Sequence, residues 1–162
     1  MAAVVALAAC GRSPLPPRLA GLLRTRTFSG ARAARMMREI HGREVAPSDS
    51  AVADYGKPAR LRVWLTRYPD GVSAHRAFAA MLAALRSPAS PFPPPRQDPS
   101  RAGRWSTVQG RTHHVFWVSE RSVYWLEGDP GVVFTAADEL PEPTTGILAR
   151  WMGSSAARPR FA

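Results

Sequence analysis

The sequence predicts a single α+β domain, in which an antiparallel sheet of about four to five strands carries two to three helices. Segments with the two-residue alternation of strands and segments with the 3.6-residue period of helices follow one another in mixed order. That order is helix, strand, strand, helix, three strands, helix. It favours helices packed against one face of the sheet. The patterned region covers about 115 residues, a usual length for one domain with its own core.

Five segments are predicted as strands. The clearest runs from Arg60 to Tyr68, where apolar and polar side chains alternate until a Pro-Asp-Gly turn ends the pattern. The last two strands are joined by the two residues Glu120-Arg121 as a hairpin. The other four segments are Ala51 to Tyr55, Arg104 to Gln109, His113 to Ser119 and Ser122 to Gly128.

Helical periodicity marks four segments. Ala31 to His41 has Ser29 as its expected cap and Gly42 as its stop. The other three are Ser73 to Arg86, Thr135 to Leu140 and Thr145 to Met152. Between the halves of the domain lies a proline-rich irregular stretch from Ser87 to Gly103. Seven residues with matching periods are predicted to share one core: Leu61, Val63, Leu65, Phe78, Leu82, Phe116 and Val118.

The short apolar start of the chain ends in Leu7-Ala8-Ala9-Cys10-Gly11. These residues resemble the lipobox of bacterial lipoproteins, in which an aliphatic residue and two small ones precede a cysteine. The resemblance implies lipidation of Cys10, cleavage just before it, and a periplasm-facing protein anchored in the cell envelope. Because Gly11 is no retention signal, it implies the outer membrane in a two-membrane bacterium. No basic residue precedes Arg12, although a signal peptide normally begins with one.

The resulting organisation has four parts. Residues 1–9 are a signal peptide and residues 10–27 a lipidated N-terminus with a flexible basic tether. Residues 28–143 form the α+β domain. Residues 144–162 are a short helix and a disordered tail. Two alternatives for the N-terminus stay open: Cys10 is an ordinary apolar residue, or the seven arginines and absent acids before Glu39 belong to a mitochondrial presequence.

The net charge of +10 is unevenly distributed. Residues 1–44 carry +6 and residues 45–162 carry +4. Basic residues near a membrane are attracted to anionic headgroups by about 1 kcal/mol each. Arginine in place of lysine, with much Ala, Pro and Gly, is also typical of a GC-rich coding sequence. No specific nucleic-acid partner is therefore predicted.

Residues that carry chemistry are few. His113 and His114 are adjacent on a strand and point to opposite faces, so they do not share a metal ion. His41 is placed to favour the helix dipole at a helix end. Glu127 and Asp129 share a strand face near a turn that ordinarily carries solvated acids, so we expect a structural role for them. Nucleophile-elbow, phosphate-loop and dinucleotide motifs are absent from the sequence. No catalytic residue, metal site or cofactor is predicted.

Three tryptophans are the candidate ligand-binding residues: Trp64, Trp117 and Trp125. The final hairpin is apolar on both faces, which predicts a central position with both sides covered. Trp64 alternates with core-facing residues and is the expected exposed aromatic.

We expect a lipid-anchored binding or interaction module of the envelope. The membrane is its first partner, with an envelope protein or a small apolar ligand as a second. The alternatives are an envelope enzyme assembled from residues such as His41, His113 and Glu127, or an organellar or nucleic-acid-binding protein with a transit peptide. A polar cleft that holds those three residues would favour the enzyme.

Overall fold

The structure, a computed structural model, describes residues 13–41 and 47–144. These residues form three helices: α1 (Gly30–His41), α2 (Gly71–Arg86) and α3 (Pro130–Asp138). They also form eight strands: β1 (Arg18–Leu19), β2 (Leu22–Ser29), β3 (Asp49–Tyr55), β4 (Leu61–Arg67), β5 (Arg96–Gln97), β6 (Trp105–Gln109), β7 (Thr112–Ser119) and β8 (Ser122–Gly128). The strands make one antiparallel sheet in the order β1-β2-β3-β4-β8-β7-β6-β5.

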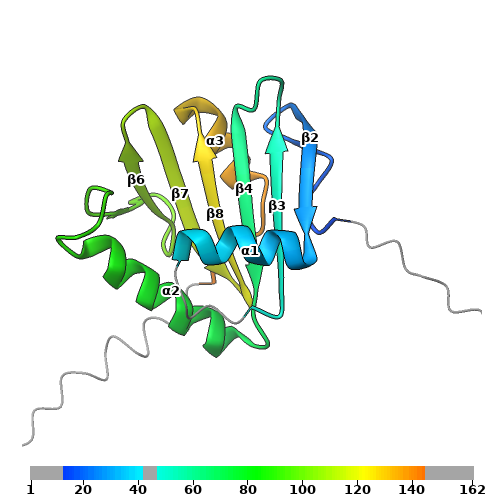
Figure 1. The fold of residues 1–162 in the computed structure, drawn as a ribbon. Helices are drawn as coiled ribbons and strands as arrows, with labels where there is room; N and C mark the ends of the chain where they lie inside the picture. The colour runs from blue at the N-terminus through cyan, green and yellow to red at the C-terminus, as the bar shows by residue number, and fades with distance from the viewer. Residues whose placement is uncertain (1–12, 42–46, 145–162) are drawn as a thin grey trace, which may run out of the picture.

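The sheet is covered on both faces (Figure 1). Helices α1 and α2 lie on one face, where α1 crosses the middle strands, and α3 lies on the other. The α+β class is therefore confirmed. The expectation that all helices share one face is wrong, because α3 packs against Trp117 and Leu126 from behind. Within residues 13–41 and 47–144, none of the helices combines the length and the hydrophobicity of a transmembrane span.

The sheet divides the core into separate clusters. Leu61, Val63 and Leu65 pack with α3 on one face, whereas Phe78 and Phe116 pack with α2 on the other. All seven residues predicted for the core are buried. The prediction that they share one core is wrong, since successive strand residues point to opposite faces and both faces are apolar. As expected, the β7–β8 hairpin is central and covered on both sides.

The sheet has more strands than the four to five expected. The five predicted strands correspond to β3, β4, β6, β7 and β8, and the additional ones are β1, β2 and β5. Strand β1 and most of β2 lie in residues 10–27, for which the sequence predicts a flexible tether. Leu15 and Leu19 are buried there, and the Tyr55 hydroxyl donates to the Pro16 carbonyl at 2.9 Å. The domain thus begins well before residue 28.

Helix starts differ from the sequence expectation. Helix α2 begins at Gly71 because the Asp70 side chain caps it, accepting from the Ser73 N–H at 2.7 Å. Helix α3 begins at Pro130 rather than Thr135, since proline at the first position suits a helix start. The predicted helix from Thr145 to Met152 lies outside the described residues.

The proline-rich stretch from Ser87 to Gly103 is anchored at its end by a buried arginine. The Arg104 guanidinium donates to Asp138 at 2.7 Å and to the Ala137 carbonyl at 3.2 Å. Strand β5 lies inside this stretch and pairs with β6. The stretch therefore packs on the domain, and its Phe92 reaches the face that carries α1 and α2.

Candidate binding site

Four polar side chains stand in a row across the α1/α2 face of the sheet. The register pairs Asp54 with Arg62, Arg62 with Glu127, and Glu127 with His114, on β3, β4, β8 and β7 in turn. We call these four residues the polar row. Directly paired residues of antiparallel strands lie about 5 Å apart, so the register alone brings together residues of two hairpins that are distant in the sequence.

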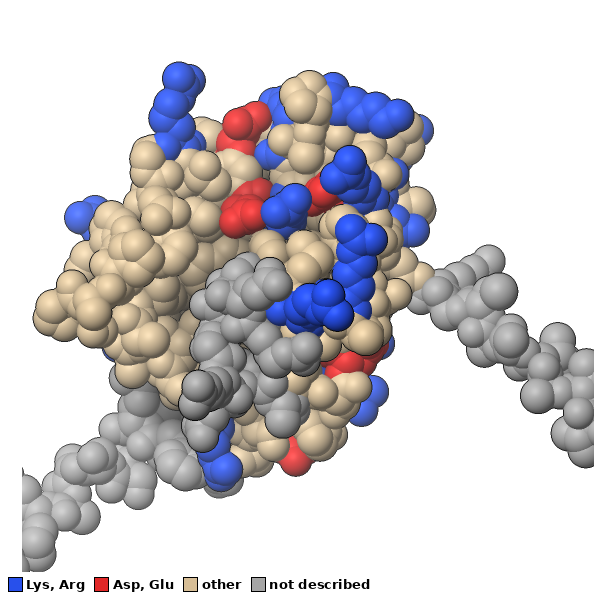
Figure 2. Space-filling model, in the orientation of Figure 1, with Lys and Arg blue, Asp and Glu red and all other residues tan. Residues whose placement is uncertain are grey.

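The polar row lies at the end of the sheet that α1 and α2 leave uncovered. This end carries the β3–β4 and β6–β7 turns, at the top of Figure 1. Two residues further along β4 and β8, Trp64 and Trp125 contact the helices. In Figure 2, acidic and basic side chains lie side by side in the upper part of this face. The face is thus apolar under the helices and charged beyond them.

Arg62 holds the centre of the polar row. Its guanidinium donates to both Asp54 oxygens, at 2.6 and 3.2 Å, and a further nitrogen lies 3.8 Å from Glu127. The Asp54 side chain is 4% exposed and that of Arg62 is 35% exposed. Hydrogen bonding to Asp54 is the main reason why the pKa of Arg62 is raised. One cation thus sits between two carboxyl groups.

Glu127 is a carboxyl group whose protonation is affected by its surroundings. Burial raises the pKa of Glu127 above its usual range, although Arg62 and a hydrogen bond from Trp64 lower it. Its Oε2 lies 3.8 Å from His114 Nδ1. A carboxyl group with a raised pKa accepts or releases a proton more easily near neutral pH.

His114 is a buried, uncharged member of the polar row. The Trp125 indole N–H donates to His114 Nδ1 at 3.2 Å, so the neutral ring carries its proton on Nε2. Burial lowers the pKa of His114 to about 4, with a smaller contribution from His113. Phe92 packs edge-on against the ring at 5.1 Å between centroids. His114 thus fixes the Trp125 indole from within the fold.

The polar row forms part of an open hollow of about 640 Å³. The Arg60–Asp129 ion pair, at 3.0 Å, stands on its rim. Small-molecule sites in proteins usually measure about 300–1,000 Å³. The hollow is lined by Asp54, Pro58, Ala59, Arg60, Leu61, Arg62, Gln109, Arg111, Thr112, His114, Glu127, Gly128 and Asp129. We call it the polar hollow.

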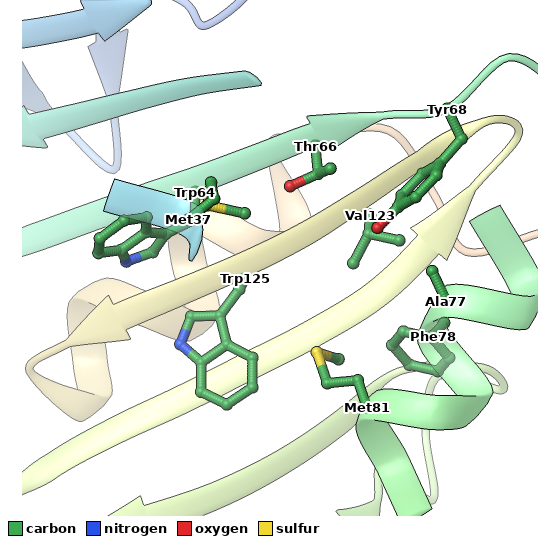
Figure 3. Close-up of a pocket in the computed structure, with 9 residues that line it drawn as sticks. All are labelled: Met37, Trp64, Thr66, Tyr68, Ala77, Phe78, Met81, Val123 and Trp125. Carbon is green, nitrogen blue, oxygen red and sulfur yellow. The ribbon is translucent and has the colours of Figure 1, made fainter. Parts of the chain in front are cut away.

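A second, apolar pocket lies between α1 and α2 (Figure 3). Met37 of α1 and Met81 of α2 lie on opposite sides of it, with Trp125 between them. Its volume is about 30 Å³, which is room for about two waters. The pocket is thus too small in this structure for an apolar ligand.

The three tryptophans predicted as ligand-binding residues have different surroundings. Trp117 is fully buried on the α3 face, stacked on Tyr124, and its indole donates to the Pro141 carbonyl at 2.8 Å. Trp64 is 6% exposed, so the expectation that it is exposed is wrong; α1 covers it. Trp125 is half-buried between the apolar pocket and His114. Trp125 connects to the polar hollow through its hydrogen bond to His114, and Trp64 through its hydrogen bond to Glu127.

Of the residues suggested for an enzyme, His113 and Glu127 lie on opposite faces of the sheet. His113 points to the α3 face, where its ring lies 6.1 Å from Phe134. The side chain of His41 and all of Cys10 lie outside the described residues. Glu127 and Asp129 both line the polar hollow, but Asp129 is engaged by Arg60 on its rim. The described residues contain no cluster of three side chains that could hold a metal ion.

Sequence reasoning missed Asp54, Arg62 and His114 as members of one site. Each is a polar residue that lies two positions from a large apolar residue of the same strand, namely Val52, Trp64 or Phe116, which is a visible signal. The strand order β3-β4-β8-β7 is what aligns them, and it was not specified by the sequence.

Comparison of the chain with protein-family models, with characterised proteins and with solved structures finds no match.

Proposed function

We propose that this protein is a lipid-anchored binding module of the cell envelope, which holds a small polar ligand in the polar hollow. The observation that carries the proposal is the polar row at the uncovered end of a sheet face that is otherwise apolar. Replacing a buried ion pair by apolar residues is often neutral or stabilising. Charged groups kept beside an open hollow therefore favour contact with a ligand over a role in stability.

The lining favours a ligand that both donates and accepts hydrogen bonds. Glu127 and Asp129 accept, whereas Arg60, Arg111 and the Gln109 amide donate. The hollow carries both signs of charge, so it suits hydroxyl-bearing or zwitterionic compounds better than a strongly charged ion. The alternative occupant, an envelope protein, would bind to the same surface.

The N-terminal fold supports the lipoprotein over the presequence. A presequence is removed, but β1, β2 and α1 all lie before residue 42 and complete the sheet edge and one helix layer. Removal of this segment would expose Val52 and Trp64, which α1 covers. Cleavage before Cys10 leaves every one of these elements in place.

The anchor is tested by labelling cells with radioactive palmitate. We expect the label on the wild-type chain and none on Cys10→Ser, which also stays uncleaved. Two or more acyl chains give stable membrane attachment, so only the wild type should enter the detergent phase. Equal labelling of both chains would contradict the anchor.

The polar hollow is tested by NMR with a panel of monosaccharides, zwitterionic amino acids and inorganic phosphate. A compound that enters the hollow should shift the Trp125 indole signal through its bond to His114. Arg111→Ala should weaken that compound's binding, whereas Arg96→Ala, on β5, should not. If no compound shifts this signal at millimolar concentration, the small-ligand proposal is wrong and a protein partner takes its place.

A further inference from the structure

We infer that the edge of the domain formed by β1, β2 and the first turns of α1 is a docking surface for an anionic lipid bilayer. This inference rests on the proposed lipid anchor for its orientation. It has an independent basis in the charge of the edge itself.

The charged residues of this edge are all basic. Residues 13–37 contain five arginines and no acidic residue. Residues 47–144 contain eleven basic and ten acidic residues, so the rest of the described domain is nearly balanced. The inference depends on this contrast between two regions and not on the arginine content of the chain. We call the five residues Arg18, Arg24, Arg26, Arg32 and Arg35 the basic edge.

The arginines of the basic edge are held on regular structure. Arg18 and Arg26 are exposed on β1 and β2, and Arg32 and Arg35 are exposed on α1. Arg24 is half-buried and donates to the Leu15 carbonyl. In Figure 2, basic side chains are spread over the right half of the face, beside β2 and the start of α1 in Figure 1.

Few acids neutralise this edge. Glu139, at the C-terminal end of α3, accepts a hydrogen bond from the Ala20 backbone N–H at 3.0 Å. Asp54, paired with Arg26 in the register, is engaged by Arg62. Within the described part of the chain, no acidic side chain forms an ion pair with Arg18 or Arg26. These two guanidinium groups are available to an external anion.

The covalent chain brings the same edge to the membrane. Leu15 is 2% exposed, so it is fixed in the core next to β1 and β2. Four residues separate it from Cys10, so the five steps along the backbone extend at most about 18 Å. A lipid on Cys10 therefore leaves no room for a long tether, and the domain must lie close to the headgroups with its β1–β2 side. Each basic residue near an anionic surface strengthens binding about fivefold.

Vesicle binding of the full, unacylated chain from cell-free translation tests the inference. Vesicles contain equal parts of phosphatidylglycerol and phosphatidylcholine, or phosphatidylcholine alone. The apolar residues 1–9 contribute equally in every sample, so the difference between the two compositions isolates the charge effect. We expect a clear preference for the anionic vesicles, which is lost in 1 M salt because the screening length falls to about 3 Å.

Two double variants with equal charge change locate the surface. Arg18→Gln/Arg26→Gln should weaken binding to the anionic vesicles about 25-fold, at about fivefold per residue. Arg76→Gln/Arg96→Gln removes two exposed arginines from α2 and β5 and should change it less than about twofold. Circular dichroism establishes that both variants are folded.

Equal losses in the two variants would overturn the inference, because net charge alone would then explain binding. Absence of any preference for anionic vesicles would overturn it too. Tight binding of DNA or RNA at physiological salt, lost only in Arg18→Gln/Arg26→Gln, would reassign the surface to nucleic acid. None of these outcomes alters the palmitate result, so failure of the docking surface and failure of the anchor are distinguishable.

Discussion

Arg62 and Asp54 face each other across β4 and β3 and are joined by two hydrogen bonds, from Nε to Oδ1 at 2.6 Å and from Nη2 to Oδ2 at 3.2 Å. The pair is asymmetric, since Asp54 is almost fully buried and Arg62 reaches the polar hollow. Removal of Arg62 and removal of Asp54 should therefore lower the free energy of unfolding by different amounts.

Arg62→Ala should destabilise the domain by about 3 kcal/mol, because it leaves the buried Asp54 carboxylate without its cation. Asp54→Ala should cost less, about 1–2 kcal/mol, since water can solvate the half-exposed guanidinium. Urea unfolding measures both values. The double variant should lose less than the sum of the two, and strict additivity would show that the pair is not coupled.

His114 should make the domain sensitive to mild acid. The pKa of His114 falls from 6.5 to about 4 on folding, so the unfolded state binds more protons between these values. Stability is therefore lost as pH falls from about 6.5 to 4, by about 3 kcal/mol. His114→Gln should remove this part of the pH dependence. The measurement is the change in the free energy of unfolding between pH 7 and pH 4.5. An equal change in the wild type and in His114→Gln would contradict a buried neutral imidazole.

Glu127 should act in the opposite direction. Its pKa is raised on folding above the usual 4.5, so the folded state holds the proton more tightly. Stability then falls as pH rises from about 4.5 through the raised value. Glu127→Gln should gain stability relative to the wild type between pH 4 and 7. A constant difference between the two proteins over this range would rule out the raised pKa.

Gly128, at the end of β8, lies against the backbone of the β3–β4 turn. A Cβ at this position would stand 2.3 Å from the Arg60 carbonyl oxygen, which belongs to the main chain and cannot rotate away. Gly128→Ala should therefore cost about 2–3 kcal/mol and distort the polar hollow. Gly131 of α3 has open space, so Gly131→Ala should be neutral or stabilising by up to about 1 kcal/mol. Equal melting temperatures for the two variants would show that the close approach is absent.

The two faces of the sheet should respond independently. Leu65→Ala and Phe116→Ala should each cost about 2–5 kcal/mol. Because these residues lie on opposite faces, their costs should add. Phe78 and Phe116 share one face, with ring centroids 6.2 Å apart, and their double variant should cost less than the sum. Non-additivity of Leu65 with Phe116 would contradict the division of the core, and Arg96→Ala serves as the surface control.

The sequence specified the strands and helices that have clear periods. Alternation identified β4 and β8, and the apolar stripe of α2 identified that helix within a few residues. It missed β1 because two residues are too short to show a period. It missed β2 because β1 pairs only with Leu22 and Leu23, so the rest of β2 is an open edge where Arg24 and Arg26 stand in place of apolar residues. The burial of Trp64 and the pairing of Asp54 with Arg62 could not be predicted for a different reason. Trp64 is covered by α1, and Asp54 meets Arg62, only once the strand order and the register are fixed. Local periodicity encodes neither the strand order nor the register.

Mass spectrometry of the mature N-terminus, on protein taken from the membranes of its host, tests the proposed envelope module most directly. We expect a chain that begins at Cys10 and carries a thioether-linked diacylglycerol, with β1 and β2 intact behind it. An unmodified chain that begins at Met1 would contradict the lipid anchor. A chain that begins after residue 12 would indicate a transit peptide instead.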